Sequence, residues 1–495
     1  MKRSSGILMS LSSLPSPYGI GTMGKAAYDF VDFLYASKQS WWQFLPLGPT
    51  TYGDSPYSSP SSFAGNPYFI DLDMLVSEHL LEQEELDGIS WGSDPENVDY
   101  GAVYAHRFRL LRIAFSRAPD SLLKDTDSFY TSNKYWLDNY ALYMSLKTEF
   151  GHVSWTQWPD DIRLRRKEAV SYYTEKLSGE IHFWIFVQYL FFRQWEALKS
   201  YAHEKGIGFI GDIPIYMAMD SADVWSEPEF FLLDEYCVPT EVSGVPPDEF
   251  TADGQLWGNP IYDWERMKQD GFGWWKRRIN GASALYDVIR IDHFRGLASY
   301  WAVPYGDKTA RNGVWREGPG MELINALKAW FPGLEFIAED LGYPTPEVAK
   351  LVADSGFPGM NVLQFGFEPD DDSIFMPHYI EINNVCYIGT HDNDTAVGWL
   401  ASLDERTVDF FDEYTHHTQD ESRCRTLMRV GMSSPAKLFV MTMQDILELP
   451  SKCRMNTPGS PYGNWRWRML EGAASGEIAD ELAHLTRLYR RTSFN

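Results

Sequence analysis

The chain has 495 residues and a formal net charge of −26 at pH 7. A chain of this length can bury a large core and hold more than one structural unit. The negative charge argues against a nucleic acid as the main partner, because phosphate backbones are bound by basic surfaces. No apolar stretch is long enough to span a membrane, and serines and prolines interrupt the apolar run near the N-terminus. Neither a membrane anchor nor a signal peptide is therefore expected.

Four cysteines are spread along the chain without the spacing of metal ligands or redox motifs. They predict a reduced, cytoplasmic protein. Aromatic residues make up 15% of the chain and include 19 Trp. Most of these are expected in the core, and the others could be flat apolar platforms for a neutral, ring-shaped ligand such as a sugar.

Apolar segments with the length of buried strands recur along the chain, at 6–11, 41–47, 208–212, 287–292, 335–339, 361–367, 385–392 and 436–445. Helical patterns lie between several of them, including 25–37, 321–331 and 346–355, and a last amphipathic helix is expected over 477–492. Eight strands that alternate with helices predict an α/β fold, a (β/α)₈ TIM barrel with a parallel sheet.

Two gaps between these strands are too long for plain barrel connections. Residues 48–207 hold several helical patterns and predict a helical subdomain inserted after the second strand. Residues 213–286 begin with a loop-rich stretch and predict a second insertion, with a substrate-covering loop, after the third strand. No repeat or flexible linker is present, so residues 1–495 are expected to form a single catalytic barrel with these largely helical insertions.

Three of the expected strands end in acidic residues, at Asp292, Glu339 and Asp392. The C-terminal ends of barrel strands meet at the face where TIM-barrel active sites lie. Buried acids are costly unless their charge is used, so the three together predict an active site. Taken singly, each has an ordinary alternative, such as a structural ion pair for Asp292 or the capped start of a helix for Glu339.

Cleavage of a glycosidic bond with retention needs one ionised carboxylate and one protonated carboxyl group. Asp292 suits the first role, because Arg290 two residues earlier points to the same face of the strand and favours the ionised acid. Glu339 suits the second role, because it ends an apolar strand where desolvation keeps a carboxyl protonated. Asp340 is the competing residue, on the opposite face of the strand.

The third carboxylate, Asp392, could grip sugar hydroxyls, with His293 and His391 as hydrogen-bonding neighbours. A metal site is the alternative at residues 391–394, but the segment lacks the spacing of known metal motifs. No metal or organic cofactor is therefore expected.

Three loops, at 54–60, 244–260 and 456–467, could form walls of the site, and ordinary turn chemistry is their alternative. Phe250 and Trp257 lie on a Gly/Pro-rich loop, where they would suit a lid over a sugar chain.

Eight motifs follow one another across nearly the whole chain: GILMSLSSLPSPYGIG (6–21), GDSPY (53–57), GVPPD (244–248), GQLWGNP (254–260), RIDHFRG (290–296), AEDLG (338–342), GTHDNDT (389–395) and NTPG (456–459). In content and order they resemble the 4-α-glucanotransferases of glycoside hydrolase family 77, also called amylomaltases or disproportionating enzymes. The resemblance implies a retaining transglycosylase that moves α-1,4-glucan segments from a donor maltooligosaccharide to the 4-OH of an acceptor glucan or glucose.

The resemblance also implies roles for individual residues. Asp292 becomes the nucleophile, Glu339 the acid/base and Asp392 the carboxylate that stabilises the transition state. The residues that match the family's substrate-binding positions are Arg290, His293, His391, Tyr57, Asp212, Asp248, Phe250, Trp257 and Asn464, and Tyr52 matches a second glucan contact of some members.

One motif departs from the family pattern. Ser10-Leu11-Ser12-Ser13 stands where many members carry His-Pro-Thr-Ser, which leaves the role of that loop open. The chain also lacks the N-terminal extension of some bacterial members and the starch-binding modules of some plant ones, so the compact form is expected. An α-glucan hydrolase with the same carboxylates and a catalytically inactive glucan-binding protein remain the alternative functions, and the oligomeric state is open.

Overall fold

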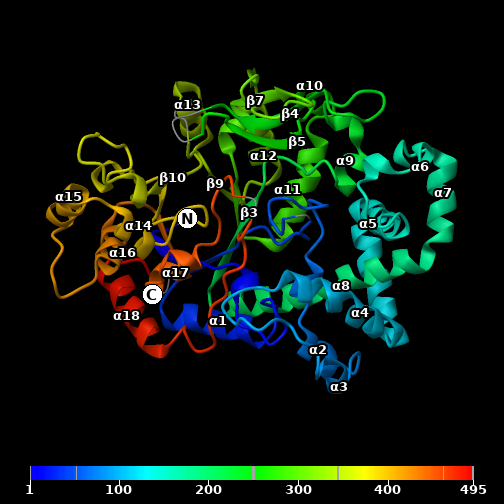
Figure 1. Ribbon diagram of the computed structural model, residues 1–495, viewed down its shortest axis with the longest axis horizontal. Coiled ribbons are helices and arrows are strands. Elements are labelled where there is room, and N and C mark those ends of the chain that lie inside the picture. The colour runs from blue at the N-terminus through cyan, green and yellow to red at the C-terminus, as the bar shows by residue number, and fades with distance from the viewer. Residues whose placement is uncertain (1, 52, 248–250, 343–344, 461, 493–495) are drawn as a thin grey trace.

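A computed structural model describes residues 2–51, 53–247, 251–342, 345–460 and 462–492. Its centre is an eight-stranded parallel sheet with the order β10-β11-β12-β1-β2-β3-β6-β9 (Figure 1). In chain order the strands are β1 (Ser4–Leu8), β2 (Trp41–Gln43), β3 (Gly208–Ile213), β6 (Val288–Ile291), β9 (Glu335–Ala338), β10 (Gly359–Val362), β11 (Asn384–Tyr387) and β12 (Leu438–Thr442). The N–H of Ala338 donates to the carbonyl of Pro358 at 2.9 Å, which brings β9 beside the start of β10 and closes the sheet into a barrel. The predicted (β/α)₈ fold is confirmed.

Helices on the outside of the barrel connect successive strands or follow the last one: α1 (Lys25–Ala36), α8 (Ser178–Glu204), α11 (Gly273–Leu285), α12 (Gly320–Trp330), α13 (Pro346–Ser355), α14 (Ala396–Ser402), α15 (Glu405–Thr415), α16 (Arg423–Ser433), α17 (Met443–Ile446) and α18 (Gly476–Leu488). Helix α13 shows how local sequence sets these bounds. Thr345 caps its N-terminus by accepting a hydrogen bond from the N–H of Val348, and Pro346 takes the first helical position. Gly356 ends the helix with a φ of +69°, which a glycine adopts without strain.

A helical lobe lies between β2 and β3, on the right of Figure 1. It contains α2 (Leu72–Ser77), α3 (Gln83–Leu86), α4 (Tyr100–Ser116), α5 (Asp120–Glu149), α6 (Asp160–Arg163) and α7 (Lys167–Lys176), and α8 runs from the lobe into the barrel wall. We propose this lobe as the subdomain predicted over 48–207. Among the described helices, which include the long α5 and α8, none is long and apolar enough to cross a membrane.

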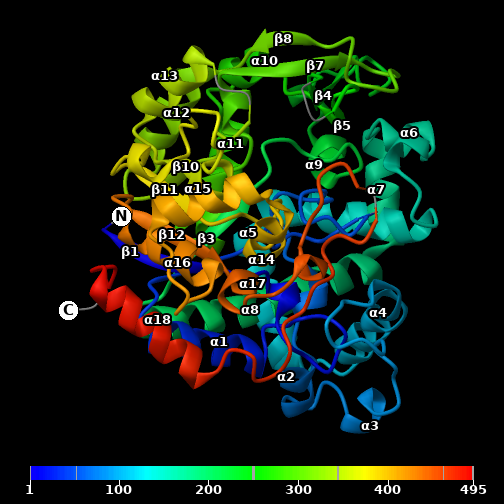
Figure 2. The ribbon, with the colours of Figure 1, turned by 60° about the vertical axis from the view of Figure 1, so that its left-hand side comes forward.

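A second, antiparallel sheet lies above the barrel in Figures 1 and 2. Its order is β5-β4-β7-β8, with β4 (Glu241–Val245), β5 (Gln255–Pro260), β7 (Ser299–Pro304) and β8 (Val314–Glu317). Short helices α9 (Ala222–Ser226) and α10 (Trp264–Gln269) precede β4 and follow β5 in the sequence. The insertion predicted over 213–286 contains β4 and β5, but β7 and β8 of the same sheet follow β6 and were not predicted. All four residues of β8 are exposed, so the strand lacks the apolar alternation that would have revealed it.

The two ends of the chain are joined by a buried guanidinium, that of Arg491. Its nitrogens donate to backbone carbonyls of Ser4, Gly431, Met432, Ser434 and Ala436 at 2.8–3.2 Å. These carbonyls belong to β1, to the end of α16 and to the turn that leads into β12. One side chain therefore connects the first and last barrel strands with the segment that follows α18.

We expect the substitution Arg491→Leu to lower the free energy of unfolding by about 2–4 kcal/mol, because it removes the hydrogen bonds of a buried guanidinium to five backbone carbonyls. Arg3 also donates to three of these carbonyls, those of Met432, Ser434 and Ala436, and this limits the loss. Urea-induced unfolding measures the change. Arg487→Leu is the matched control, since Arg487 lies in the last turn of α18 on the exposed surface. Equal stability of the two variants would contradict a structural role for Arg491.

Candidate active site

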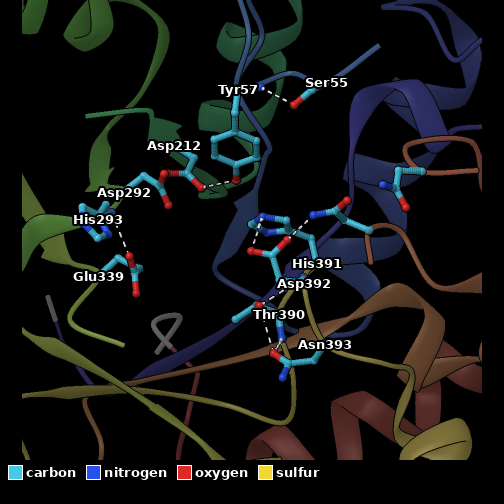
Figure 3. Close-up of polar contacts among 12 residues, drawn as sticks. Ser55, Tyr57, Asp212, Asp292, His293, Glu339, Thr390, His391, Asp392 and Asn393 are labelled. Atoms are coloured by element: carbon cyan, nitrogen blue, oxygen red, sulfur yellow. Dashed lines mark hydrogen bonds and ion pairs between the residues drawn. The ribbon is translucent and has the colours of Figure 1, made fainter. Parts of the chain in front are cut away.

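The three acidic residues predicted at strand ends come together at the C-terminal mouth of the barrel. Asp292 follows β6, Glu339 follows β9, and Asp392 lies just beyond β11. Figure 3 shows their side chains around one central space, together with Asp212 of β3. The strand register explains part of this arrangement, because Asp212 pairs with Arg290 across β3 and β6.

Arg290 holds two of the carboxylates. Its side chain is 4% exposed, and its Nη1 donates to Asp212 Oδ2 at 2.5 Å and to Asp292 Oδ1 at 3.0 Å. The hydroxyl of Tyr57 donates to the same oxygen of Asp212 at 2.7 Å. Burial works to lower the pKa of Arg290, but Asp212 and Asp292 raise it well above its ordinary value. The guanidinium is therefore a permanent positive charge at the base of the site.

Glu339 lies in a different environment. It is 9% exposed, and its carboxyl oxygens accept the backbone N–H groups of His293 at 2.7 Å and Leu341 at 2.8 Å. Burial raises the pKa of Glu339 far above its usual range, while Arg290 works to lower it and Asp292 raises it further. This carboxyl can therefore keep a proton at neutral pH.

Burial also raises the pKa of Asp292, but by less, because the hydrogen-bonded guanidinium of Arg290 opposes the shift. Arg290 therefore favours the ionised form of Asp292, as its place on the strand predicted, but burial outweighs it and leaves the pKa of Asp292 raised rather than lowered. Of the two carboxyl groups, that of Asp292 is adjacent to a cation and that of Glu339 ends an apolar strand.

His293 adopts a left-handed backbone conformation directly after Asp292, with a φ of 47°. Burial lowers the pKa of His293 to about 3, and the neighbouring Arg295 adds to the shift, so the ring is neutral. The ring of Trp257 meets it edge to face, with 4.7 Å between centroids. Trp257 belongs to β5 of the antiparallel sheet and remains 38% exposed, so it reaches from that sheet to the site.

Asp392 carries the most ionised carboxylate of the three. Its Oδ2 lies 3.3 Å from His391 Nε2, and its Oδ1 accepts a hydrogen bond from Asn456 Nδ2 at 2.6 Å. Burial works to raise the pKa of Asp392, but His391 and Asn456 lower it to about 2. The ring of Tyr57 stacks on His391 with 5.2 Å between centroids.

Other predicted residues lie elsewhere or cannot be placed. Asp340, the competitor of Glu339, turns away and accepts the N–H of Met360 at 2.8 Å. Asn464 is engaged within its own loop, where it accepts from the N–H of Thr457 and donates to the carbonyl of Ser460. The predicted positions that lie outside the described residues are Tyr52, Asp248 and Phe250.

Two residues at the site received no individual role from the sequence. Asn456 is the first residue of the NTPG motif. The motif is visible in the sequence, but the hydrogen bond from Asn456 to Asp392 is not. Trp465 is buried, with its ring centroid 5.8 Å from that of Tyr57 and 5.9 Å from that of His391. Spacing along the chain could not reveal these contacts, because more than 60 positions separate Asn456 from Asp392 and Trp465 from His391.

Within the described part of the chain, no group of three or more His, Cys, Asp or Glu side chains is arranged to hold a metal ion. All four cysteines are free thiols. The site thus presents a buried carboxyl group, Glu339, a partly buried one of different acidity, Asp292, and a third, strongly acidic one, Asp392. This combination suits protonation of a leaving group and nucleophilic attack within one cleft.

Comparison with known proteins agrees with this chemistry. A family model described as 4-alpha-glucanotransferase matches residues 9–473. A 4-alpha-glucanotransferase from Streptococcus pneumoniae is 47% identical over 497 residues, which cover 100% of this chain and 98% of the relative. One from Clostridium butyricum is 46% identical, with 98% and 100% of the two chains covered.

Among solved structures, an amylomaltase from Streptococcus agalactiae in complex with acarbose is 40% identical. It superposes with a TM-score of 0.97 and covers 99% of this chain and 100% of its own. The resemblance seen in the motifs is thereby confirmed at the level of the whole chain. This chain belongs to the 4-alpha-glucanotransferase family.

Proposed function

We propose that the protein is a retaining 4-α-glucanotransferase, which moves α-1,4-glucan segments from a donor maltooligosaccharide to the 4-OH of an acceptor glucan or glucose. Membership of the family supports the reaction. The unequal environments of Asp292 and Glu339 carry the mechanism, because a double displacement needs one ionised and one protonated carboxyl group. Arg290 donates to Asp292, whereas Glu339 accepts two backbone N–H groups in a buried position.

In the first step Glu339 donates its proton to the glycosidic oxygen, and the bond between that oxygen and C1 of the donor breaks. The carboxylate of Asp292 forms an ester bond to C1 in the same step. Arg290 holds Asp292 Oδ1, so we assign the attack to the other oxygen, Oδ2. The departing glucan carries the proton and leaves the cleft.

In the second step Glu339 accepts the proton of an acceptor 4-OH, whose oxygen attacks C1 and releases Asp292 as a carboxylate. The negative charge of Asp292 raises the pKa of Glu339. The ester removes that charge, so the pKa of Glu339 falls while the intermediate exists. The same residue can therefore act as the acid first and as the base afterwards.

The remaining residues are proposed to hold and distort the sugar at the site of cleavage. The ionised Asp392 would stabilise the positive charge that develops on the sugar ring. His391, the neutral His293, Tyr57 and Asp212 offer hydrogen-bonding groups around the same space, as Figure 3 shows.

Transfer competes with hydrolysis, because water and a sugar hydroxyl can both attack the ester. We propose that Trp257 helps to exclude water, because it extends from β5 to the ring of His293 beside the nucleophile. A catalytically inactive glucan-binding protein is the less supported alternative, because Asp292, Glu339 and Asp392 all lie at the C-terminal mouth of the barrel.

We further propose that the substrates are α-1,4-glucans of starch or glycogen metabolism in the cytoplasm, a location that the four free thiols support. Two carboxyl groups complete the double displacement, so no cofactor is required by this mechanism.

The roles of the two carboxyl groups can be separated with a donor whose leaving group needs no proton. With maltotriose, Glu339→Gln should lower kcat by about 10²–10⁴-fold, the range lost with a general acid. With α-maltosyl fluoride the first turnover of the same variant, followed as the pre-steady-state burst of fluoride, should be about as fast as in the wild type, because ester formation then needs no acid. Later turnovers should stay slow, because the second step still needs Glu339 as the base. Asp292→Asn should lose activity on both donors, because the ester cannot form.

Asp340→Asn is the matched control for that experiment, since Asp340 is adjacent in sequence but bonds to the N–H of Met360. It should retain activity with both donors. If ester formation by Glu339→Gln, measured in the first turnover, were equally slow with both donors, the assignment of Glu339 as the acid would be wrong.

The pH dependence should follow the two raised pKa values. Activity with maltotriose should fall as pH rises through the pKa of Glu339, which must be protonated, and this limb should lie well above the range of an ordinary glutamate. It should fall as pH drops through the pKa of Asp292, which must be ionised and is also raised. Plots of log(kcat/KM) against pH test both limbs. With α-maltosyl fluoride, whose leaving group needs no proton, the alkaline limb should be absent from kcat/KM. An alkaline limb that persists with this donor would contradict the assignment of Glu339 as the acid.

Trp257→Ala should raise the ratio of hydrolysis to transfer several-fold, because it opens the cleft beside His293 to water. The ratio is obtained from maltotriose by resolving products by chain length and counting new reducing ends. Trp315→Ala, on the same small sheet but at strand β8, is a control that should keep the ratio of the wild type. An unchanged ratio in Trp257→Ala would show that another element excludes water.

A further inference from the structure

The loop after β12 is fastened to the segment that carries Asp392. Residue Asn456 makes two of the contacts: its N–H donates to the carbonyl of His391 at 3.1 Å, and its Nδ2 donates to Asp392 Oδ1 at 2.6 Å. Arg454 makes a third contact, from Nη2 to the carbonyl of Asp392. Within the loop itself, Nε of Arg454 donates to the carbonyl of Asn456 at 2.6 Å. The mechanism described above uses neither Arg454 nor Asn456.

These contacts fix the carboxylate of Asp392 from two sides. Asn456 donates to Oδ1, while His391 Nε2 lies 3.3 Å from Oδ2. The backbone of Asp392 is held separately by Arg454. A carboxylate with a partner on each oxygen and a tethered backbone has little freedom to rotate, so its direction relative to the sugar site is set in advance.

An amide is a suitable partner for such a carboxylate. It donates a hydrogen bond that favours the ionised form, yet it brings no positive charge that would cancel the negative one. The charge of Asp392 thus remains available to the positive charge that develops on the sugar ring. A second carboxylate at the same distance would repel Asp392 instead.

We propose that Asn456 is a positioning residue for glucan transfer: its amide keeps the carboxylate of Asp392 ionised and correctly directed, and Arg454 holds Asn456 in place. The inference rests on the proposed role of Asp392 in the reaction. It assigns a task to the NTPG motif, and it makes the loop after the last barrel strand part of the catalytic apparatus.

The electrostatic surroundings of Asp392 matter for the test. The charged or titratable groups that act on it or respond to it are, in order, its neighbour His391, Arg290 on β6, Asp292 just after β6, Tyr57 in the loop after β2, and Arg454 through its backbone contact. All of these stay unchanged when Asn456 alone is substituted.

Asn456→Asp is the decisive variant, because the new carboxyl has nearly the shape of the amide. When it is ionised it repels Asp392, and kcat for maltotriose disproportionation should fall about 10²-fold, the size of effect expected from a misplaced catalytic group. When it is protonated it can donate to Asp392 as the amide does. Two carboxyl groups this close retain one proton to a raised pH. The ratio of variant to wild-type kcat should therefore rise as pH falls.

That ratio, taken at each pH, cancels the titration of Asp292 and Glu339, which is common to both proteins. Asn456→Ser gives the second measurement, since its short side chain cannot reach Asp392 at any pH. Asn456→Ser should lower kcat about 10²-fold. The ratio of its kcat to that of the wild type should not change with pH. Thermal unfolding of each variant checks that the fold is retained.

Asn97→Asp is the matched control, because Asn97 also donates its amide to a carboxylate, that of Asp94 at 2.7 Å, on the exposed surface of the helical lobe. The kcat of Asn97→Asp divided by that of the wild type should stay near one at every pH. A folded Asn456→Ser variant with wild-type kcat, or an Asn456→Asp variant whose ratio does not change with pH, would overturn the proposal. Failure of the wild type to disproportionate maltotriose would instead refute the proposed function, so the two failures are distinguishable.

Discussion

The buried guanidinium of Arg290 is the interaction on which the mouth of the barrel depends. Two carboxylates, Asp212 and Asp292, bond to its Nη1, and Asp392 and Glu339 lie within the range of its charge. Acids gathered in a buried cleft would repel one another and take up protons without a compensating cation. A fixed positive charge beneath Asp292 keeps that residue ionised and leaves Glu339 as the group that holds a proton.

This arrangement requires a closed barrel. Asp212 and Arg290 lie on neighbouring strands in register, and Glu339 reaches the same space because β9 pairs with β6. The backbone N–H of Asp292 also donates to the carbonyl of Ile213, and the N–H of Phe294 donates to the carbonyl of Glu339. The strand ladder thus continues into the loops that carry these acids, so the positions of the carboxyl groups are fixed by the sheet.

Elements outside the barrel complete the mouth from different directions. Tyr57 enters from the loop after β2, Trp257 from the antiparallel sheet, and Asn456 from the loop after β12. Each of them touches a residue at the end of a barrel strand or beside one. The insertions that make the chain longer than a simple barrel therefore also shape its cleft, which suits a polymeric substrate that must be held beyond the point of cleavage.

The sequence alone determined the fold class and the principal acids. Eight apolar runs alternated with helical patterns, and three of these runs ended in Asp292, Glu339 or Asp392, because strand composition and its termination are local properties of a chain. The family resemblance, carried by contiguous motifs, was accessible for the same reason. Strand β8 was missed, because its stability comes from pairing with β7 while all of its side chains are exposed.

Only the tertiary structure decided which distant residues meet. The side chain of Asp340 turned to Met360, which separated it from its neighbour Glu339 as a candidate acid. Asn456 reached Asp392 across 64 positions, and Arg491 bridged to Ser4 across 487. Such contacts depend on which barrel strands pair and on the path of the loops between them. A hydrophobic pattern within a short stretch of sequence contains no information about either.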